Sequence, residues 1–351
     1  MKAIVWYGRK EMRMELPPDP TPRSGEVKLK IKSCGICGSD VHEYYEGPFL
    51  IPAKPHPLTG RSLGPVIMGH EFCGEVVEVG PDVTGVALGD RVVVNPLIYC
   101  GECHYCKKGL HIMCLKLGTY GFAADGAFAE YGVFPARSLV KVPPNVSDEE
   151  AAFAEPVAVA VHAVLRGRMN LGDTVGVVGG GPIGLLVTQV ALAAGAKEVF
   201  VVEPIKGRRE IAEGLGARAV LNPEERDVGR EIAALTKGLR ADVVFDCVGS
   251  QGSFDTAVAM SGRRGKVCVV GMSLVPIAVQ FFRLWTHEKE IVFSSGYEDD
   301  FEAALALIAS GRIRVRDLIT DRVGLEGVVE ALTKVKEDPG AHVKIMVIPE
   351  G

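Results

Sequence analysis

Four cysteines in one short stretch are the residues of this chain whose spacing predicts chemistry most directly. They follow the pattern C-x2-C-x2-C-x7-C and are Cys100, Cys103, Cys106 and Cys114. Four thiolates this close together can surround one zinc ion, and such a site is structural because it leaves no open coordination position. An iron–sulfur cluster is the rival interpretation, although ferredoxin motifs usually continue C-x3-C-P. Two disulfides are the third, and they would need an oxidising compartment.

A second set of metal-binding residue types is spread over the first 155 positions. It comprises Cys37, the adjacent His70 and Glu71, and Glu155 before a proline. One thiolate, one imidazole and one carboxylate can hold a catalytic zinc ion and leave the fourth position for water or substrate. A single cysteine or histidine is more often a core residue than a ligand, so these residues alone leave both interpretations open.

A glycine-rich turn lies between a predicted strand, Thr174–Val178, and a predicted helix, Ile183–Ala194. It fits the pattern G-x-G-x-x-G, and its residues are Gly179, Gly181, Pro182, Ile183 and Gly184. Glycine at these positions permits a tight turn, approach of the backbone to a pyrophosphate, and close packing of helix on strand. The N-terminus of the helix would attract the phosphates. This context favours a dinucleotide site.

Glu203 lies about 20 residues after the glycine turn, where dinucleotide-binding domains place an acid on the adenosine ribose. Such an acid repels a 2′-phosphate and therefore favours NAD over NADP, whereas Arg208 could hold that phosphate. A solvated carboxylate at a strand end is the alternative for Glu203. Residues after later strands could contact the nicotinamide half or be ordinary turn residues: Val248, Gly249 and Gly271.

Two regions with different patterns of predicted secondary structure must position these residues. Up to about residue 145, short strand candidates alternate with turns and predict a β-barrel or sandwich: Lys2–Trp6, Glu26–Ser33, Gly74–Val79, Asp90–Val94 and Phe128–Val133. After Ser147, strand and helix candidates alternate, which predicts a parallel sheet with helices on both faces. The candidates there are Ala151–Leu165, Glu198–Val202, Ala241–Cys247, Lys266–Val270, Glu290–Phe293, Phe301–Ser310, Leu325–Val335 and Val343–Val347.

Composition limits the class of protein. The length of 351 residues predicts two domains rather than one. A net charge of −5 gives no reason to expect nucleic acid or a membrane as partner. No apolar run reaches the ~18 residues that a membrane span needs. Nine cysteines, with no signal peptide recognised at Met1, lead us to expect a reducing cytoplasm.

The ordered set of motifs resembles the zinc-dependent medium-chain dehydrogenase/reductase family. It comprises the segment 34–42, Gly69-His70-Glu71, the four cysteines, Glu155-Pro156 and the glycine turn, so the resemblance covers nearly the whole chain. Within the family the chain is most similar to the (R,R)-2,3-butanediol dehydrogenase branch, near the sorbitol dehydrogenases. The distinguishing stretches are Glu46-Gly47-Pro48-Phe49 and Pro55-His56-Pro57-Leu58-Thr59-Gly60.

The resemblance implies an α/β fold with three parts. Residues 1–150 would form a β-rich, GroES-like catalytic domain. Residues 151–296 would form a Rossmann domain, a doubly wound parallel sheet that binds NAD. Residues 297–351 would return to the catalytic domain.

The resemblance also implies two zinc ions per chain. Cys37, His70 and Glu155 would bind the catalytic ion, with Glu71 as an alternative or transient ligand. The four clustered cysteines would bind the structural ion.

The implied reaction is the reversible oxidation of a secondary alcohol by hydride transfer to NAD, with 2,3-butanediol and acetoin as the expected pair. Ser39 and His42 would form a proton relay, and Lys344 would contact the cofactor pyrophosphate. Pocket walls are expected from Tyr45, Phe49, Ile51 and Tyr120, although each could equally be a core residue. A homodimer or homotetramer is the expected assembly.

Three other functions remain open at this point. The substrate could be a polyol such as sorbitol, or L-threonine. The chain could be a non-catalytic dinucleotide-binding protein, although that would not require both the zinc ligands and the relay. A redox-active C-x-x-C pair, here Cys34 and Cys37, normally begins a helix after a strand within a strand–helix–strand unit. The glycines around this pair and its β-rich surroundings argue against that function.

Overall fold

In the computed structural model, which describes residues 1–349, buried and less buried side chains alternate along β3 (Glu26–Gly35) as far as Lys32. Val27, Leu29 and Ile31 are buried, and the lysines between them face outward. This period of two is the pattern of a strand with one face on the core. Strand β3 is central to the first part of the chain, because it pairs with β5, β9 and β18.

The chain divides into two units. The first contains residues 1–155, 304–309 and 319–349, and the second contains residues 156–303 and 310–318. The domain limits expected from the sequence, near 150 and 296, remain predictions.

The first unit is built on β-sheets. Its largest sheet has the order β10-β6-β5-β3-β18-β17, with β9 also paired to β3. The strands of this unit other than β3 are β1 (Ala3–Gly8), β2 (Glu11–Glu15), β4 (Val66–Ile67), β5 (Glu71–Val79), β6 (Arg91–Val94), β7 (Leu97–Ile98), β8 (Gly118–Thr119), β9 (Tyr131–Pro135), β10 (Leu139–Lys141), β17 (Ile319–Val323) and β18 (Lys344–Val347).

The helices of the first unit are fewer. They are α1 (Gly38–Glu46), α2 (Asp148–Ala152) and α10 (Val328–Glu337), while α3 (Ala154–Arg166) and α9 (Phe301–Ala309) cross the limits between the units. The core is mainly aliphatic and also contains Trp6, Phe72, Phe128 and Phe134, with the rings of Phe72 and Phe134 in contact. Strand β18 brings the C-terminal part of the chain into this sheet, antiparallel to β3.

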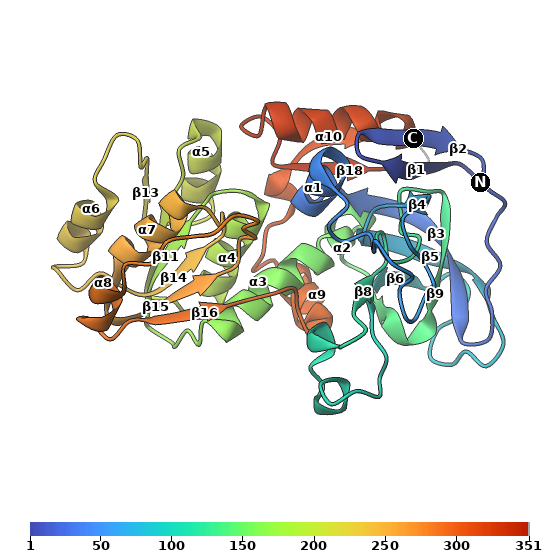
Figure 1. Cartoon of the computed structure of the whole chain (residues 1–351), viewed down its shortest axis with the longest axis horizontal. Helices are drawn as coiled ribbons and strands as arrows, with labels where there is room; N and C mark the ends of the chain where they lie inside the picture. The colour runs from blue at the N-terminus through green and yellow to red at the C-terminus, as the bar shows by residue number, and fades with distance from the viewer. Residues whose placement is uncertain (350–351) are drawn as a thin grey trace. The chain divides into compact units, whose positions relative to one another are not determined.

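The second unit is a single parallel sheet of six strands in the order β13-β12-β11-β14-β15-β16. Figure 1 shows β14, β15 and β16 side by side, with the helices packed around the sheet. The strands are β11 (Thr174–Val178), β12 (Glu198–Val202), β13 (Ala219–Leu221), β14 (Ala241–Asp246), β15 (Ser261–Val269) and β16 (Glu290–Phe293). The helices are α4 (Pro182–Ala193), α5 (Lys206–Gly214), α6 (Val228–Leu235), α7 (Gln251–Met260) and α8 (Phe281–Trp285).

The order of the strands in this sheet reverses at β11. From β11, the strands β12 and β13 follow on one side and β14, β15 and β16 on the other. All five residues of β11 are buried, as expected for the central strand of a sheet covered on both faces. Ligands of such sheets bind outside the carboxyl ends of the strands where the order reverses. The glycine turn follows β11 at that position, so the fold class predicted from the sequence is confirmed.

One predicted helix is wrong in detail. The expected helix Ala151–Leu165 is two helices, α2 and α3, which meet at Phe153. The N-cap is as predicted, because Ser147 and Glu150 form a capping box with mutual backbone hydrogen bonds.

Candidate active site and metal centres

Cys37 lies where β3 gives way to α1, and it is the N-cap residue of that helix. The segment therefore runs from a strand into a helix, but β3 pairs antiparallel with β5 and β9 in a β-rich unit and is not part of a strand–helix–strand unit. The chemistry also opposes a C-x-x-C redox pair. Cys34 is fully buried, and burial raises its pKa well above the usual range, so its thiolate is disfavoured.

Asp40 orients two parts of the site at once. Its Oδ2 accepts a hydrogen bond from the backbone N–H of Cys37 at 2.9 Å, and its Oδ1 lies 3.4 Å from Nδ1 of His70. A carboxylate on one ring nitrogen leaves the other nitrogen available as a metal ligand. Burial lowers the pKa of His70, but the charges of Asp40 and Cys37 outweigh burial and raise that pKa well above its usual value.

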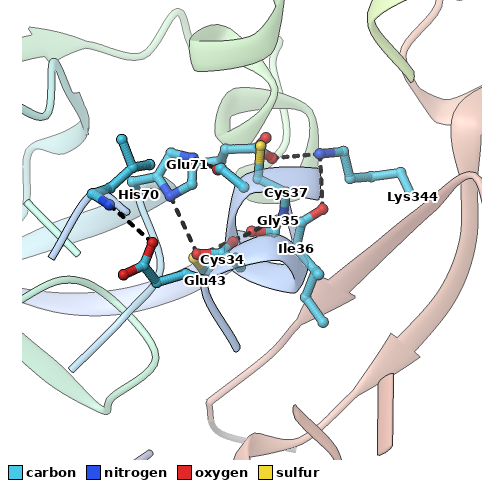
Figure 2. A network of polar contacts seen from close by, with 11 residues as sticks. Cys34, Gly35, Ile36, Cys37, Glu43, His70, Glu71 and Lys344 are labelled. Atoms are coloured by element: carbon cyan, nitrogen blue, oxygen red, sulfur yellow. Dashed lines mark hydrogen bonds and ion pairs between the residues drawn. The ribbon is translucent and has the colours of Figure 1, made fainter. Parts of the chain in front are cut away.

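Glu71 begins β5 and points into the same site. Its Oε2 accepts a hydrogen bond from Nζ of Lys344 at 2.5 Å, and both side chains are at most 2% exposed. Figure 2 shows this pair beside Cys37. Burial opposes the charge on Lys344, but Glu71 and Cys37 raise its pKa above the usual value. The Lys344 ammonium also donates to the carbonyl of Ile36 at 3.1 Å.

These residues fit a metal ion. The ligand atoms of Cys37, His70 and Glu71 all lie within 4.8 Å of one another. Oε1 of Glu71 is buried and has no hydrogen-bond partner within residues 1–349, which leaves one carboxylate oxygen without a partner. A buried polar atom without a partner costs free energy unless a ligand satisfies it. Thiolate, imidazole and carboxylate are the ligand types of a catalytic zinc site.

Glu155 does not belong to this close cluster in the described part of the chain. It lies in the first turn of α3, is buried, and contributes to raising the pKa of Lys344. The structure thus brings Glu71, rather than Glu155, into the group with Cys37 and His70. The role of Glu155 as a ligand stays a prediction.

Ser39 and His42 lie one turn apart on α1. Oγ of Ser39 is 3.3 Å from Nε2 of His70, so the hydroxyl faces the metal cluster. His42 is exposed and lies 3.7 Å from the Glu46 carboxylate. One hydroxyl at the cluster and one imidazole at the surface are compatible with a relay, which stays a prediction.

The four-cysteine segment forms the second metal centre. It follows β7 and contains two short 3-10 helices, Cys106–Lys108 and His111–Met113. The four sulfur atoms lie within 4.8 Å of one another, with Cys100 Sγ at 3.9 Å from Cys106 Sγ and 3.5 Å from Cys114 Sγ. Zinc–sulfur bonds of about 2.3 Å give a tetrahedron with edges of about 3.8 Å. The geometry fits one tetrahedral ion.

Backbone donors prepare this centre for thiolates. Hydrogen bonds from the backbone of Cys106 and Leu115 lower the pKa of Cys103 to about 6. The amides of Cys100 and Lys116 donate to Sγ of Cys114, both at 3.3 Å. All nine cysteines of the chain carry free thiols, so the disulfide interpretation finds no support.

The glycine turn has the geometry that its glycines predict. Gly179 has φ +98°, a conformation that favours glycine, and Gly181 caps α4 with Pro182 as the first helical residue. A side chain on Gly184 would collide with the carbonyl of Gly179, so the helix begins in direct contact with the turn. The helix N-terminus is thereby exposed to a phosphate group.

Glu203 lies at the end of β12 but is turned inward. It is 3% exposed; its Oε2 accepts from the N–H of Gly180 at 2.6 Å and its Oε1 from the N–H of Ile205 at 2.8 Å. Arg208 lies next to the turn, and burial lowers its pKa despite the nearby Glu203 charge. Glu203 therefore shapes the glycine turn directly.

The later turn residues also gather at the carboxyl ends of strands. Val248 and Gly249 donate their N–H groups to Oδ1 of Asp246, at the end of β14. Gly249 has φ +79°, and any side chain on it would meet the backbone of Gly271. The close backbone contact explains both glycines, and a contact with the nicotinamide half stays a prediction.

Sequence reasoning missed Asp40 and Glu43, two acids that are fully buried on α1. Their spacing of three residues places them on one face of a helix, which is a signal only once the helix itself is predicted. Of the expected pocket walls, Ile51 is a core residue, and Tyr45 donates from its hydroxyl to Oγ1 of Thr333 on α10.

Comparison with known proteins identifies the class. Residues 23–144 match the alcohol dehydrogenase GroES-like domain, and residues 182–310 match the zinc-binding dehydrogenase domain. The (R,R)-butanediol dehydrogenase of Bacillus subtilis is 39% identical over 99% of this chain and 100% of its own. The sorbitol dehydrogenase of the same organism is 32% identical, over 99% and 97% of the two chains. The crystal structure of 2R,3R-butanediol dehydrogenase from Bacillus subtilis superimposes with a TM-score of 0.93 at 37% identity, covering 99% of both chains.

The fold and its two candidate metal centres are those of a metal-dependent oxidoreductase. The chain belongs to the zinc-dependent medium-chain alcohol dehydrogenase family. It is therefore an enzyme rather than a non-catalytic binding module. Within residues 1–349 we find no helix that is long and apolar enough to cross a membrane.

Proposed function

We propose that this enzyme interconverts 2,3-butanediol and acetoin, with NAD as the hydride carrier. The observation that carries the proposal is an apolar loop, residues 47–51, at the end of the helix that begins at Cys37. Phe49 and Leu50 of this loop are 43% and 44% exposed, so they offer apolar contacts to a substrate. Identity of 39% with a butanediol dehydrogenase over the whole chain supports the same substrate class.

The first unit supplies the groups that act on the alcohol. Cys37, His70 and Glu71 would hold zinc, which lowers the pKa of a bound alcohol when present. Ser39, with its hydroxyl at the cluster, would take the alcohol proton, and the exposed His42 would release it to water. A histidine suits release near neutral pH because its ordinary pKa is about 6.5.

The glycine turn supports NAD as cofactor. Gly179, with its positive φ, and Gly184, packed against the carbonyl of Gly179, fit the dinucleotide fingerprint, and Gly181 is the N-cap of α4. Glu203, which is hydrogen-bonded to this turn, would repel the 2′-phosphate of NADP. Lys344 would contribute to the pyrophosphate site, although its described partners are Glu71 and Ile36.

A polyol or L-threonine is the second candidate substrate. A polyol needs several polar partners, because a hydroxyl group buried without one costs free energy. The loop 47–51 offers apolar side chains instead, which favours the smaller diol.

The deciding experiment is NAD reduction with stereopure 2,3-butanediols, sorbitol and L-threonine, before and after chelation and zinc restoration. We expect zinc-dependent turnover of one butanediol isomer at least tenfold faster than that of the other substrates. A preference for sorbitol or threonine would overturn the assignment of 2,3-butanediol as substrate, and the proposed reaction class, oxidation of an alcohol by NAD, would stand.

We also propose that the enzyme assembles as a homodimer or homotetramer. Four aromatic side chains around α8 and the edge strand β16 are at least two-thirds exposed: Phe281, Phe282, Trp285 and Phe293. An exposed apolar patch next to an unpaired strand edge favours association, and a symmetric interface uses the same patch twice. The free thiols lead us to propose a reducing cytoplasm as its location.

A further inference from the structure

Glu43 is a fully buried acid whose described partners are all backbone amides. Its carboxylate accepts hydrogen bonds from Phe49, at 3.0 and 3.1 Å, from Leu50 at 3.0 Å and from Ile51 at 3.2 Å. Three amides on one carboxylate form a strong, directional anchor, because hydrogen bonds to a charged acceptor are roughly twice as strong as neutral ones. The loop that follows α1 is thereby folded back onto its own helix.

Gly47 makes this return possible. Its N–H donates to the backbone carbonyl of Glu43 at 3.1 Å, which ends the helix. A side chain on Gly47 would collide with that carbonyl and would come within 3.0 Å of the Glu43 carboxyl group. Glu43 and Gly47 therefore act together to set the path of residues 47–51.

The anchored loop presents its side chains in two directions. Ile51 is 1% exposed and fixes the end of the loop in the core of the first unit. Phe49 and Leu50, whose amides both donate to Glu43, leave nearly half of their surface free. Their backbone is held while their side chains remain available.

The same helix ties this loop to the metal ligands. Cys37 caps α1, and Asp40 and Glu43 are fully buried on one face of it. Six residues of helix span about 9 Å, so the Glu43 backbone lies within that distance of the Cys37 backbone along α1. Figure 2 includes Glu43 in the same close-up as Cys37 and His70.

We propose that Glu43 is a positioning residue for substrate discrimination. It holds residues 49–51 so that Phe49 and Leu50 form a fixed apolar wall that favours a short diol over a long polyol. The inference rests on the proposed function for the identity of the preferred alcohol. The underlying claim, that Glu43 sets the preference between short and long alcohols, can be judged for any substrate that the enzyme accepts.

The test compares Glu43→Gln and Glu43→Asp with the wild-type holoenzyme. Glutamine keeps the size of the side chain but places an amide group among backbone donors, and aspartate keeps the charge but withdraws it from them. Glu330→Gln is the matched control, because Glu330 is an exposed acid on α10 paired with Lys334. Hydrogen exchange of the amides of residues 49–51 should be at least about tenfold faster in Glu43→Gln and unchanged in the control.

Specificity is measured on the same proteins as kcat/KM for 2,3-butanediol and for sorbitol. We expect the ratio of the two to fall by about tenfold or more in Glu43→Gln, with zinc content and the KM for NAD unchanged. Phe49→Ala removes a half-exposed side chain, so it should fold and shift the ratio in the same direction. A merely structural role would lower both kcat/KM values equally.

Two results would overturn the inference. The first is unchanged exchange at residues 49–51, which would mean that Glu43 does not hold the loop. The second is faster exchange with an unchanged substrate ratio, in both Glu43→Gln and Phe49→Ala. A wild-type enzyme that prefers sorbitol would instead contradict the proposed function, and the change of ratio in the variants would still decide the role of Glu43.

Discussion

Two buried charged residues, Asp40 and Lys344, orient the three ligands of the close metal cluster. Asp40 holds the backbone of Cys37 and faces the ring of His70, while Lys344 holds one oxygen of Glu71. Such supporting contacts decide which atom of a ligand is free for the ion. Predictions about single residues can therefore separate loss of the ion from loss of the fold.

Cys37→Ser should abolish turnover and leave the fold intact. A serine hydroxyl is a poor substitute for a thiolate as a zinc ligand, but it fits the same N-cap position of α1. Elemental analysis should find about one of the two zinc ions per chain lost, with an unchanged circular dichroism spectrum. Unfolding of this variant would contradict an open catalytic site at Cys37.

Lys344→Met should destabilise the protein by about 3 to 5 kcal/mol, since it leaves the buried Glu71 carboxylate without its cation. The double variant Glu71→Gln with Lys344→Met should recover part of that loss, because no charge is then buried alone. Urea unfolding of the two single variants and the double variant forms the cycle. Additive losses would show that the two residues do not interact.

Glu203→Ala should raise the KM for NAD and reduce the preference for NAD over NADP. The variant removes the acceptor of the Gly180 and Ile205 amides, and with it the negative charge that we propose for the adenosine site. Kinetics with both cofactors measure the preference, and Glu210→Ala on the exposed face of α5 is a suitable control. Unchanged kinetics for both cofactors would exclude Glu203 from the site.

At the scale of elements, the sequence predicts best where strands are short apolar runs between turns. Three predicted strands agree with β11, β12 and β16 residue for residue. Helix α1 could not be predicted, because Gly38 lowers the helix propensity of its first turn and its cap depends on a hydrogen bond from the Cys37 amide to the Asp40 side chain.

Prediction of the candidate site is also limited to features that do not depend on contacts of the folded chain. The family resemblance selects Cys37, His70 and Glu155, with Glu71 as an alternative ligand, whereas the structure groups Glu71 with Cys37 and His70. The contact of Lys344 with Glu71 could not be derived, because it joins residues 273 positions apart through the pairing of β18 with β3. The role of Glu43 could not be predicted either, because its partners are backbone amides of residues 49–51 that reach it only in the folded loop.

The four-cysteine segment should depend on its metal for order. Between β7 and β8 it contains only two 3-10 helices of three residues each, so zinc would supply most of its cross-links. Cys103→Ser should therefore lose one zinc ion and become sensitive to protease within residues 100–114. Mass spectrometry of the fragments locates the cuts, and Cys37→Ser, which should lose the other ion, should resist cleavage there.

At the scale of the whole molecule, the exposed aromatic patch and the edge strand β16 predict assembly. Phe293→Lys places a charge on that edge, where the native side chain is 67% exposed. We expect the mass measured by light scattering to fall toward that of one chain. Leu171→Lys, at an exposed turn before β11, should keep the wild-type mass; a monomeric wild type would refute the proposed assembly.

The contact between Glu71 and Lys344 has a consequence for how the protein is made. Ribosomes add roughly 5 to 20 residues per second, so a nascent chain carries Glu71 for about 14 to 55 s before Lys344 is synthesised. During that interval β3 lacks its neighbour β18, and the acid lacks the cation that makes its burial tolerable. Chains arrested before residue 344 should therefore hold the first unit open to proteases and chaperones, and metal loading at Cys37 and His70 should follow translation rather than accompany it.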